Sequence, residues 1–446
     1  MKKTSLILIA ILISFNAGAA TVKLGLESAV QKIMDASHDV KKADLNIRKS
    51  EAVFNAARAN RFPKLSASGT YMNNINVDEP GKPRYIEFPD MPVLNSIGSQ
   101  IGFIPTAGGF RVPDNIGMVG LDLTQPIYTF GRIGYGLDAA RSAIKIAESS
   151  AELARREMRV AAVQIYYGAK MAAHIQEIVG QSLLNAKKNQ RALTMGAGRA
   201  NKANLLKIST DVVVKEAQLA DAKFNADSAM RMLKIMADID DDAVVVLVDE
   251  IPSKFPKAAD SEIYAHPEWD IYQESYNASR ASMKSKYAGW MPTLAATASY
   301  NYVMMHEAAD VWNGQNSKNA SVGLAISLPI LDGGLARYQA TQDAREADRA
   351  MQDLDKSKKM RRNDLIEATN KHNYLIENAK TQERALDLAR RTYKMSADRF
   401  AAGQTSAVEL SDVESSLVQL EIALLNTRMQ IAIAYETIKK LTGENR

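Results

Sequence analysis

The chain contains no cysteine. This excludes disulfide bonds, thiolate metal sites, a cysteine nucleophile and a lipid-modified N-terminal cysteine. After residue 20 there is also no run of about twenty apolar residues, so we expect no helix that crosses an inner membrane. The 51 acidic and 56 basic residues are interspersed, and no basic block indicates a nucleic acid partner.

Motifs that carry catalysis are also missing. There is no P-loop and no GxSxG sequence. Three glycines near residue 134 have the wrong order for a dinucleotide-binding loop and follow no Rossmann unit. The histidines show no HExxH or other ligand spacing; they are His38, His174, His266, His306 and His372. We therefore expect no enzyme, no cofactor and no metal site.

The first twenty residues have the features of a secretory signal peptide. Lys2 and Lys3 form a basic start, residues 6–15 are apolar, and residues 17–19 read Ala-Gly-Ala, an A-x-A cleavage site. The apolar stretch is too short to span a membrane as a helix. The sequence predicts an exported protein that is periplasmic, secreted or in the outer membrane.

Two segments about two hundred residues apart follow the same plan. In residues 321–328 (SVGLAISL) large apolar residues alternate strictly with small ones, and in residues 118–124 Val119, Leu121 and Leu123 point away from Asp122 and Thr124. A period of two predicts a strand with one apolar and one polar face. Each strand leads to a proline, Pro126 or Pro329, then to glycine and a long helical pattern. The doubled plan indicates an internal repeat.

Two further strands precede these. The segments ANRFPKLSASGTY and AGWMPTLAATASY align without gaps, and Pro63 and Pro292 mark the points where alternation begins. The predicted strands cover residues 65–77 and 294–304, long enough to cross a bilayer at a tilt. The stretch 80–113, rich in proline and glycine, is predicted to be a long surface loop, and 305–319 a shorter one.

Helical patterns fill the remainder. Helices are predicted at 24–61, 131–195 and 201–237, and in the second half at 266–290, 335–402 and from the glycine break at 403 to 441. At 1.5 Å per residue, roughly 65 residues give a rod on the order of 100 Å long. Such lengths are typical of coiled coils or helical tunnels rather than globular cores.

The last helix carries a heptad seam, which steps alternately by three and four residues. Its residues are Leu410, Val413, Leu417, Leu420, Leu424, Thr427, Ile431, Ala434, Ile438 and Leu441. The corresponding positions of the first half are Leu205, Ile208, Val212, Lys215, Leu219, Ala222, Ala226, Ala229, Leu233 and Met236. We expect these positions to form packing seams, and Lys215 is the one residue out of character.

Four strands cannot close a barrel alone, because known single-chain barrels begin at about eight strands and open edges are not tolerated in lipid. The barrel must then be shared between subunits in cyclic symmetry. Aromatic residues near the strand ends or on their faces fit the girdle of a membrane interface; they are Tyr71, Tyr128, Phe130, Trp290 and Tyr300. An alternative of another class is an exported coiled-coil adhesin or scaffold without a channel.

With these features the chain resembles the TolC-like outer-membrane factor family. The resemblance rests on the strand entries at Pro63 and Pro292, the strand-to-helix exits Pro126-Ile127-Tyr128 and Pro329-Ile330-Leu331, residues 399–403 (RFAAG) and residues 440–443 (KLTG). It implies a homotrimer in outer-membrane lipid: a β-barrel with four strands from each chain, continued by a long coiled-coil α-helical barrel in the periplasm. It also implies a periplasmic adaptor and an inner-membrane transporter as partners.

The resemblance also implies site residues. A periplasmic acidic gate falls on Glu409 and Asp412, and the matching positions of the first hairpin are Asn204 and Lys207. We hypothesise that Lys207 pairs with one of the two carboxylates in a closed state. The adaptor-docking hairpin ends fall on Gly196, Gly198, Arg199, Phe400, Gly403 and Gln404.

The predicted organisation is a signal peptide (1–20), a first repeat (21–237), a linker (238–262) and a second repeat (263–446). The predicted function is a passive outer-membrane exit duct of a tripartite system for small-molecule efflux. The outer-membrane component of type I protein secretion remains an alternative.

Overall fold

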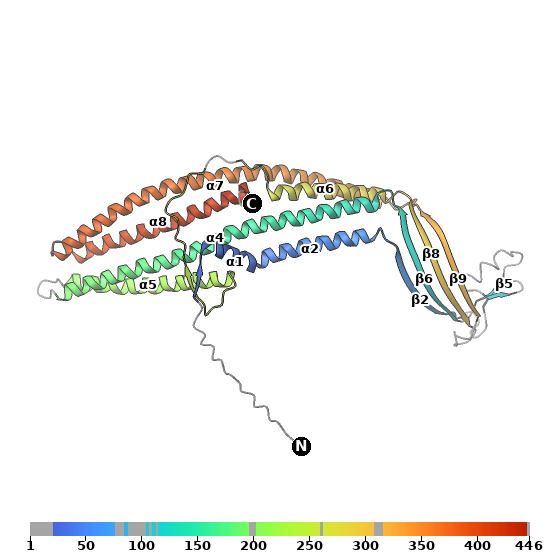
Figure 1. Cartoon of the computed structure of the whole chain (residues 1–446), viewed down its shortest axis with the longest axis horizontal. Helices are drawn as coiled ribbons and strands as arrows, with labels where there is room; N and C mark the ends of the chain where they lie inside the picture. Colours follow the sequence, from blue (N-terminus) through green and yellow to red (C-terminus); the bar gives the residue numbers. More distant parts are fainter. Residues whose placement is uncertain are drawn as a thin grey trace, which may run out of the picture. The chain divides into compact units, whose positions relative to one another are not determined.

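A computed structural model describes residues 21–75, 84–87, 104–106, 109–112, 115–195, 202–258, 262–306 and 315–443 (Figure 1). The predicted signal peptide lies outside these residues. The chain forms two compact units. Among the described residues, unit 1 comprises those within 1–45, 148–270 and 355–446, and unit 2 comprises those within 46–147 and 271–354. Both units draw on both halves of the sequence, and they are described separately below.

Unit 2 contains a four-stranded antiparallel sheet. Its strands are β2 (Lys64–Asn73), β6 (Asn115–Tyr128), β8 (Thr293–His306) and β9 (Gln315–Ser327), in the order β2-β6-β8-β9 (Figure 1). The register aligns Leu65 with Leu123, Leu123 with Ala298, and Ala298 with Val322. Directly opposed residues share a face of a sheet. The period of two therefore predicted the four strands and their faces, but not all of their ends. β2 ends at Asn73, although the strand was predicted to continue to 77, and β8 and β9 extend into the predicted loop at 305–319.

Three of the four marked prolines lie just outside strands, and one lies within. Pro63 and Pro292 immediately precede β2 and β8, and Pro329 lies two residues after the end of β9. Pro126 lies inside β6, two residues before its end, where the register against β8 shifts between Pro126 and Tyr128. The predicted end of this strand at Pro126 was therefore two residues early, because a β-bulge accommodates the proline.

The predicted loop at 80–113 contains three short strands that the sequence pattern did not indicate. They are β3 (Arg84–Glu87), β4 (Ile104–Thr106) and β5 (Gly109–Val112), which form a sheet in the order β3-β5-β4. Each has at most four residues, too few for a period of two to be recognised. The rest of this loop lies outside the described residues.

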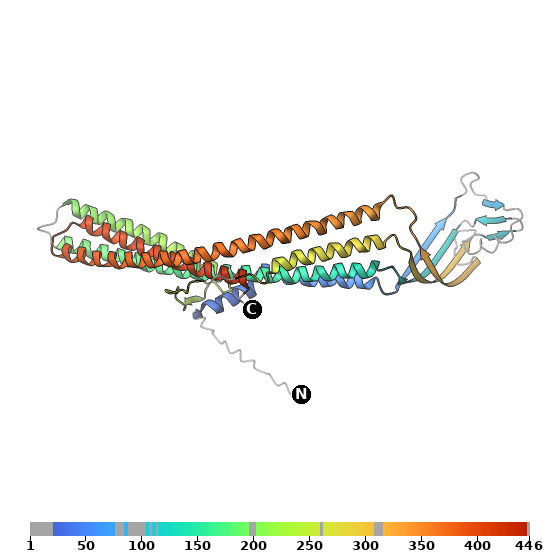
Figure 2. The same ribbon diagram turned by 90° about the horizontal axis from the view of Figure 1, so that it is seen from above.

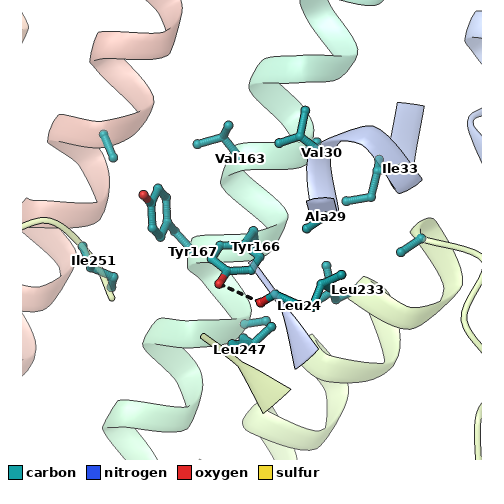
Figure 3. Packing of buried hydrophobic residues seen from close by; sticks show 14 residues of the cluster. Leu24, Ala29, Val30, Ile33, Val163, Tyr166, Tyr167, Leu233, Leu247 and Ile251 are labelled. Carbon is teal, nitrogen blue, oxygen red and sulfur yellow. Dashed lines mark hydrogen bonds between the residues drawn. The ribbon is translucent and has the colours of Figure 1, made fainter. Parts of the chain in front are cut away.

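Unit 1 has its main apolar core where β1 (Thr21–Leu24) pairs in parallel with β7 (Val244–Leu247). Figure 3 shows Leu24, Val163, Leu233 and Leu247 gathered around Tyr166, with Val30 and Ile33 beside them. The Tyr166 hydroxyl donates to the Leu24 carbonyl at 3.1 Å and accepts from the Asp249 backbone N–H at 3.0 Å. The linker predicted at 238–262 is thus partly a strand within this core.

The first predicted helix is two helices, α1 (Leu26–Ala36) and α2 (His38–Ala59). Ser37 has ψ 122°, outside the helical range, and its hydroxyl accepts from the Val40 N–H at 3.4 Å. A serine followed by an acidic residue in the first turn is a helix start signal. Residues 36–39 (ASHD) carried that signal, but the helical periodicity on both sides obscured it.

For the remaining five helices, nine of the ten ends lie within two residues of the predicted ends. These helices are α4 (Arg132–Met195), α5 (Lys202–Met236), α6 (Pro267–Ala288), α7 (Leu335–Ala401) and α8 (Ala407–Thr442). The exception is the start of α8, at Ala407 instead of 403. Within unit 1, α5 lies along α4 and α8 lies along α7 (Figures 1 and 2). No residue of either predicted heptad seam is exposed, so the seams are confirmed as packing surfaces.

Candidate functional sites: the sheet and the hairpin ends

One face of the four-stranded sheet is apolar, and the described part of the chain leaves it uncovered. Val322, Leu324 and Ile326 of β9 are 89%, 71% and 75% exposed. Exposed residues of the other strands lie on the same face by register; they are Leu65, Tyr71, Val119, Leu121, Leu123 and Tyr300. Soluble monomers rarely expose contiguous apolar surface of this kind, so the face is suited to lipid or to another apolar surface.

The opposite face carries hydroxyl and amide groups that pair with one another. The Ser299 and Ser321 hydroxyls are 2.8 Å apart, and the Ser66 hydroxyl donates to the Asp122 carbonyl at 3.4 Å. In the register Ser66, Asp122, Ser299 and Ser321 form one row across all four strands. Such a face is compatible with water, as the sequence pattern predicted.

The sheet has two open edges. Within the described parts of the chain, β2 pairs only with β6 and β9 pairs only with β8, so one side of each edge strand has no strand partner. An open edge carries unpaired backbone N–H and C=O groups, which are costly in an apolar medium. β2 and β9 run in opposite directions, because each neighbouring pair in the order is antiparallel.

The turn between α7 and α8 is a Schellman motif. Gly403 has φ +73°, in the left-handed region that glycine adopts without strain. The Gln404 N–H donates to the Arg399 carbonyl at 2.8 Å, and the Gly403 N–H donates to the Phe400 carbonyl at 3.0 Å. The sequence RFAAGQ thus ends the helix sharply, and Phe400 lies half-buried in its last turn.

Glu409 and Asp412 lie in the first two turns of α8, and both are exposed. The Ser406 hydroxyl accepts from the Glu409 N–H at 3.2 Å and caps the helix. The Thr405 hydroxyl donates to the Glu409 carboxylate. Glu409 therefore helps to hold the turn as well as presenting a negative charge to solvent.

The corresponding part of the first hairpin is described only from Lys202 onward. Lys207 is exposed and Asn204 is half-buried. Among the described residues of this chain, no ion pair joins Lys207 to Glu409 or Asp412. Gly196, Gly198 and Arg199 lie outside the described residues.

A buried charge pair near this end was not anticipated. Lys215 of α5 lies with its Nζ 3.7 Å from Oε2 of Glu414 in α8, and both side chains are almost fully buried. The signal was present in part, because Lys215 interrupts the seam of α5. Nothing in the local sequence of α8 singles out Glu414 as its partner.

No metal-binding cluster is apparent in the described residues. No group of three or more His, Asp or Glu side chains there could hold a metal ion. His266 caps α6, where its Nδ1 accepts from the Glu268 N–H at 3.2 Å. His372 is fully buried, and its Nε2 lies 3.1 Å from the Pro256 carbonyl. Each of these two histidines therefore has a contact with the backbone of its own unit.

A cavity of about 650 Å³ lies in unit 1 between residues 262–269 and α7. Trp269, Leu365 and Ile366 form its apolar lining, and Lys358 and Arg362 its basic lining.

No helix of the described chain is long and apolar enough to cross a membrane.

Comparison of the fold with solved structures gives the class. The chain is similar to a membrane protein from Pseudomonas aeruginosa (TM-score 0.75, 19% identity, 94% of this chain and 93% of that chain). It is also similar to the CmeC outer membrane channel of Campylobacter jejuni (0.72, 17%, 94% and 85%) and to the outer membrane protein VceC of Vibrio cholerae (0.71, 15%, 94% and 96%). The fold, mostly helical with a small sheet, is therefore that of outer-membrane channel proteins.

The family follows from the sequence. The model of the outer membrane efflux protein family matches residues 29–236 and 273–444, and the chain belongs to this family. It is also similar to the outer membrane efflux protein BepC of Brucella suis, with 21% identity over 193 residues. That match spans 43% of this chain and 42% of the relative. The resemblance stated above is confirmed, and the protein is an outer-membrane efflux protein of the Gram-negative envelope that extends into the periplasm.

Proposed function

We propose that the chain is one third of a passive exit duct that leads from the periplasm to the exterior. Three copies would form a twelve-stranded barrel in outer-membrane lipid, continued by a twelve-helix α-barrel in the periplasm. The partners would be a periplasmic adaptor protein and an inner-membrane transporter, which would supply both the energy and most of the substrate selection. Small-molecule efflux is the proposed task.

The observation that carries this proposal is the sheet, with its exposed apolar face and two open edges. Lipid covers an apolar face readily, but open backbone edges are not tolerated in lipid. Since β2 and β9 run in opposite directions, β9 of one copy can pair antiparallel with β2 of the next. The strand alternation then continues around a closed ring without a break. Closure removes every open edge at once.

The two halves of the chain support the internal repeat on which this assembly rests. α2 and α6 each have 22 residues, α4 and α7 have 64 and 67, and α5 and α8 have 35 and 36. Each half adds two strands to the sheet in the same sequence position. We keep the division into a first repeat (21–237), a linker (238–262) and a second repeat (263–446) as part of the proposal.

The proposed gate lies at the periplasmic end, where Glu409 and Asp412 of three copies would bring six carboxylates to one constriction. Such a ring favours cations and repels anions. Asn204 and Lys207 would face it from the first hairpin, and Lys207 would pair with a carboxylate in the closed state. The adaptor would dock at the hairpin ends, at Gly196, Gly198, Arg199, Phe400, Gly403 and Gln404.

Cysteine pairs test the assembly directly, because the natural chain has no cysteine background. Single cysteines are placed at successive positions along β2 and along β9, and the two sets are combined. Some combinations place a β9 cysteine of one copy directly opposite a β2 cysteine of the next copy. For these, oxidation in outer-membrane vesicles is expected to produce covalent dimers and trimers. The same substitutions on β6 and β8, which are flanked on both sides, serve as controls. Absence of any cross-linked trimer, together with no conductance in planar bilayers, would rule out the duct.

A further inference from the structure

Lys215 and Glu414 connect the two helical hairpins of one chain through a buried polar cluster. Their side chains are 5% and 4% exposed, and the Nζ–Oε2 distance is 3.7 Å. The Lys215 ammonium donates to the Ser182 hydroxyl at 2.6 Å, and Asn185 Nδ2 donates to Glu414 Oε1 at 3.1 Å. Ser182 and Asn185 belong to α4, Lys215 to α5 and Glu414 to α8. The cluster therefore joins three helices and both hairpins.

This pair is a poor candidate for a simple stabilising contact. Two buried charges lose more hydration energy than their attraction restores, unless the geometry is excellent. At 3.7 Å the contact is long, and burial is the largest influence on Glu414 and raises the pKa of its carboxyl group. Asp211 of α5 raises this pKa further, whereas Lys215, Asn185 and Ser182 lower it. The ionised carboxylate is thus only partly compensated.

Among the described seam residues of α5 nearest to Lys215, no other carries a charge. On either side of Lys215, the α5 seam consists of Ile208, Val212, Leu219 and Ala222. Seams of small and apolar residues tolerate a slip of one heptad, because apolar side chains exchange for apolar ones. A slip of seven residues would place Ile208 or Ala222 opposite Glu414 and leave its buried carboxylate without a counter-charge.

We propose that Lys215 and Glu414 act as a positioning pair that sets the axial register of hairpin α4/α5 against hairpin α7/α8. A single buried polar residue in a coiled-coil seam is known to select register at a cost in stability. α4 ends and α5 begins at the same end of unit 1 at which α7 ends and α8 begins (Figures 1 and 2). The pair therefore fixes how far α5 and α8 extend relative to each other at this end, and this role does not depend on the proposed duct.

The test separates register from stability by comparing an apolar replacement with a charge reversal. Cysteines replace the exposed Thr210 of α5 and Ser416 of α8 in the full-length chain and carry spin labels. Labelled chains are assembled with an excess of unlabelled chains, so that each measured distance lies within one chain. Pulsed electron paramagnetic resonance is expected to give one narrow distance for the natural pair.

K215L/E414L is expected to fold with an unchanged or higher Tm, because apolar replacement of a buried ion pair is commonly tolerated. Its distance distribution is expected to broaden or to gain a second peak, since a one-heptad slip moves one helix about 10 Å along the other. The reversed pair K215E/E414K is expected to restore one narrow peak. K215M alone is expected to lower the Tm by several degrees, because it leaves Glu414 buried without a counter-charge.

A matched control removes another charge pair between the hairpins. Lys440 and Glu157 join α8 to α4 at 3.3 Å, with 23% and 58% of their side chains exposed. K440L/E157L is expected to leave the distance distribution unchanged. A single narrow peak at the natural distance in K215L/E414L would overturn the proposal, because packing alone would then set the register. Failure of both K215L/E414L and K215E/E414K to assemble would also overturn it, because the pair would then be an ordinary stability determinant.

Discussion

The Tyr166 hydroxyl lies between the Leu24 carbonyl and the Asp249 N–H, with hydrogen bonds of 3.1 and 3.0 Å (Figure 3). One side chain of α4 thus joins the end of β1 to the segment that follows β7. The same segment caps α1, because the Asp249 carboxylate accepts from the Leu26 N–H at 2.6 Å. Burial raises the pKa of Tyr166, so the hydroxyl stays protonated and can keep donating.

Y166F is expected to destabilise unit 1 by about 1–3 kcal/mol, because it leaves the Asp249 N–H without its partner and removes one of the two donors to the Leu24 carbonyl, the other being the Val248 N–H. Resistance of purified protein to a protease over a urea series measures the change. Y167F is the matched control: Tyr167 is equally part of this core, and among the described contacts its hydroxyl has no hydrogen bond. Equal losses in Y166F and Y167F would contradict the assigned role of Tyr166.

Acid is expected to weaken unit 1 through His266. Its pKa is lowered from 6.5 to about 4, chiefly by burial and then by Arg156, Arg361 and Lys440. A histidine with a depressed pKa in the folded state contributes stability above pH 6.5 and loses it as the pH falls towards 4. The change in pKa from 6.5 to about 4 corresponds to a loss of about 3 kcal/mol in the free energy of unfolding.

H266N tests this assignment, because asparagine retains a cap for α6 but carries no titrating group. Its stability near pH 7.5 is expected to match that of the natural protein. Between pH 6.5 and 4 it is expected to lose about 3 kcal/mol less, as followed by thermal melts at half-unit pH steps. H38N, at an exposed histidine, is expected to follow the natural curve. A natural-like acid loss in H266N would assign the loss to other groups.

The two faces of β9 are expected to respond differently to a charge. Under the proposed assembly, V322R places a cation on the lipid side, which costs on the order of 2–4 kcal/mol near the bilayer midplane. S321R places the same charge on the watery side of the same strand. The amount of folded protein in outer-membrane fractions is expected to fall for V322R and to change little for S321R. The reverse ranking would mean that the faces are assigned the wrong way round.

The proposed acidic gate predicts a change in ion selectivity. E409Q/D412N would remove six carboxylates from a trimer, so the reversal potential under a KCl gradient is expected to move towards zero. D387N removes an exposed carboxylate of α7 that pairs with Arg391, and is expected to leave the reversal potential unchanged. An unchanged potential in E409Q/D412N would place the selectivity elsewhere in the chain.

Local sequence patterns predicted most of the fold. The period of two predicted the strands. The length of the helical pattern, its heptads and the glycine break at Gly403 predicted α7 and α8. Features decided by distant partners were not predictable in this way. β7 is four residues long and pairs with β1 some 220 residues earlier, and Ser37 breaks a helix whose periodicity continues on both sides.

The candidate site was predictable only in part. Lys215 was visible as an exception in its seam, but its partner Glu414 lies in the other hairpin and has no distinguishing pattern of its own. Glu409 was selected for its charge, and the structure adds its contact with Thr405 and the cap from Ser406. Sequence thus indicates which residues are unusual, whereas the packing of distant segments determines what they contact.

The parallel pairing of Thr21–Leu24 with Val244–Leu247 has a consequence for the order of folding. A segment at the start of the described chain must wait for its partner until more than half of the protein has been synthesised and exported. Contacts of such long sequence separation form slowly, because loop closure has to precede the gain from the contacts. The core around Tyr166 is therefore expected to form only after β7 has emerged.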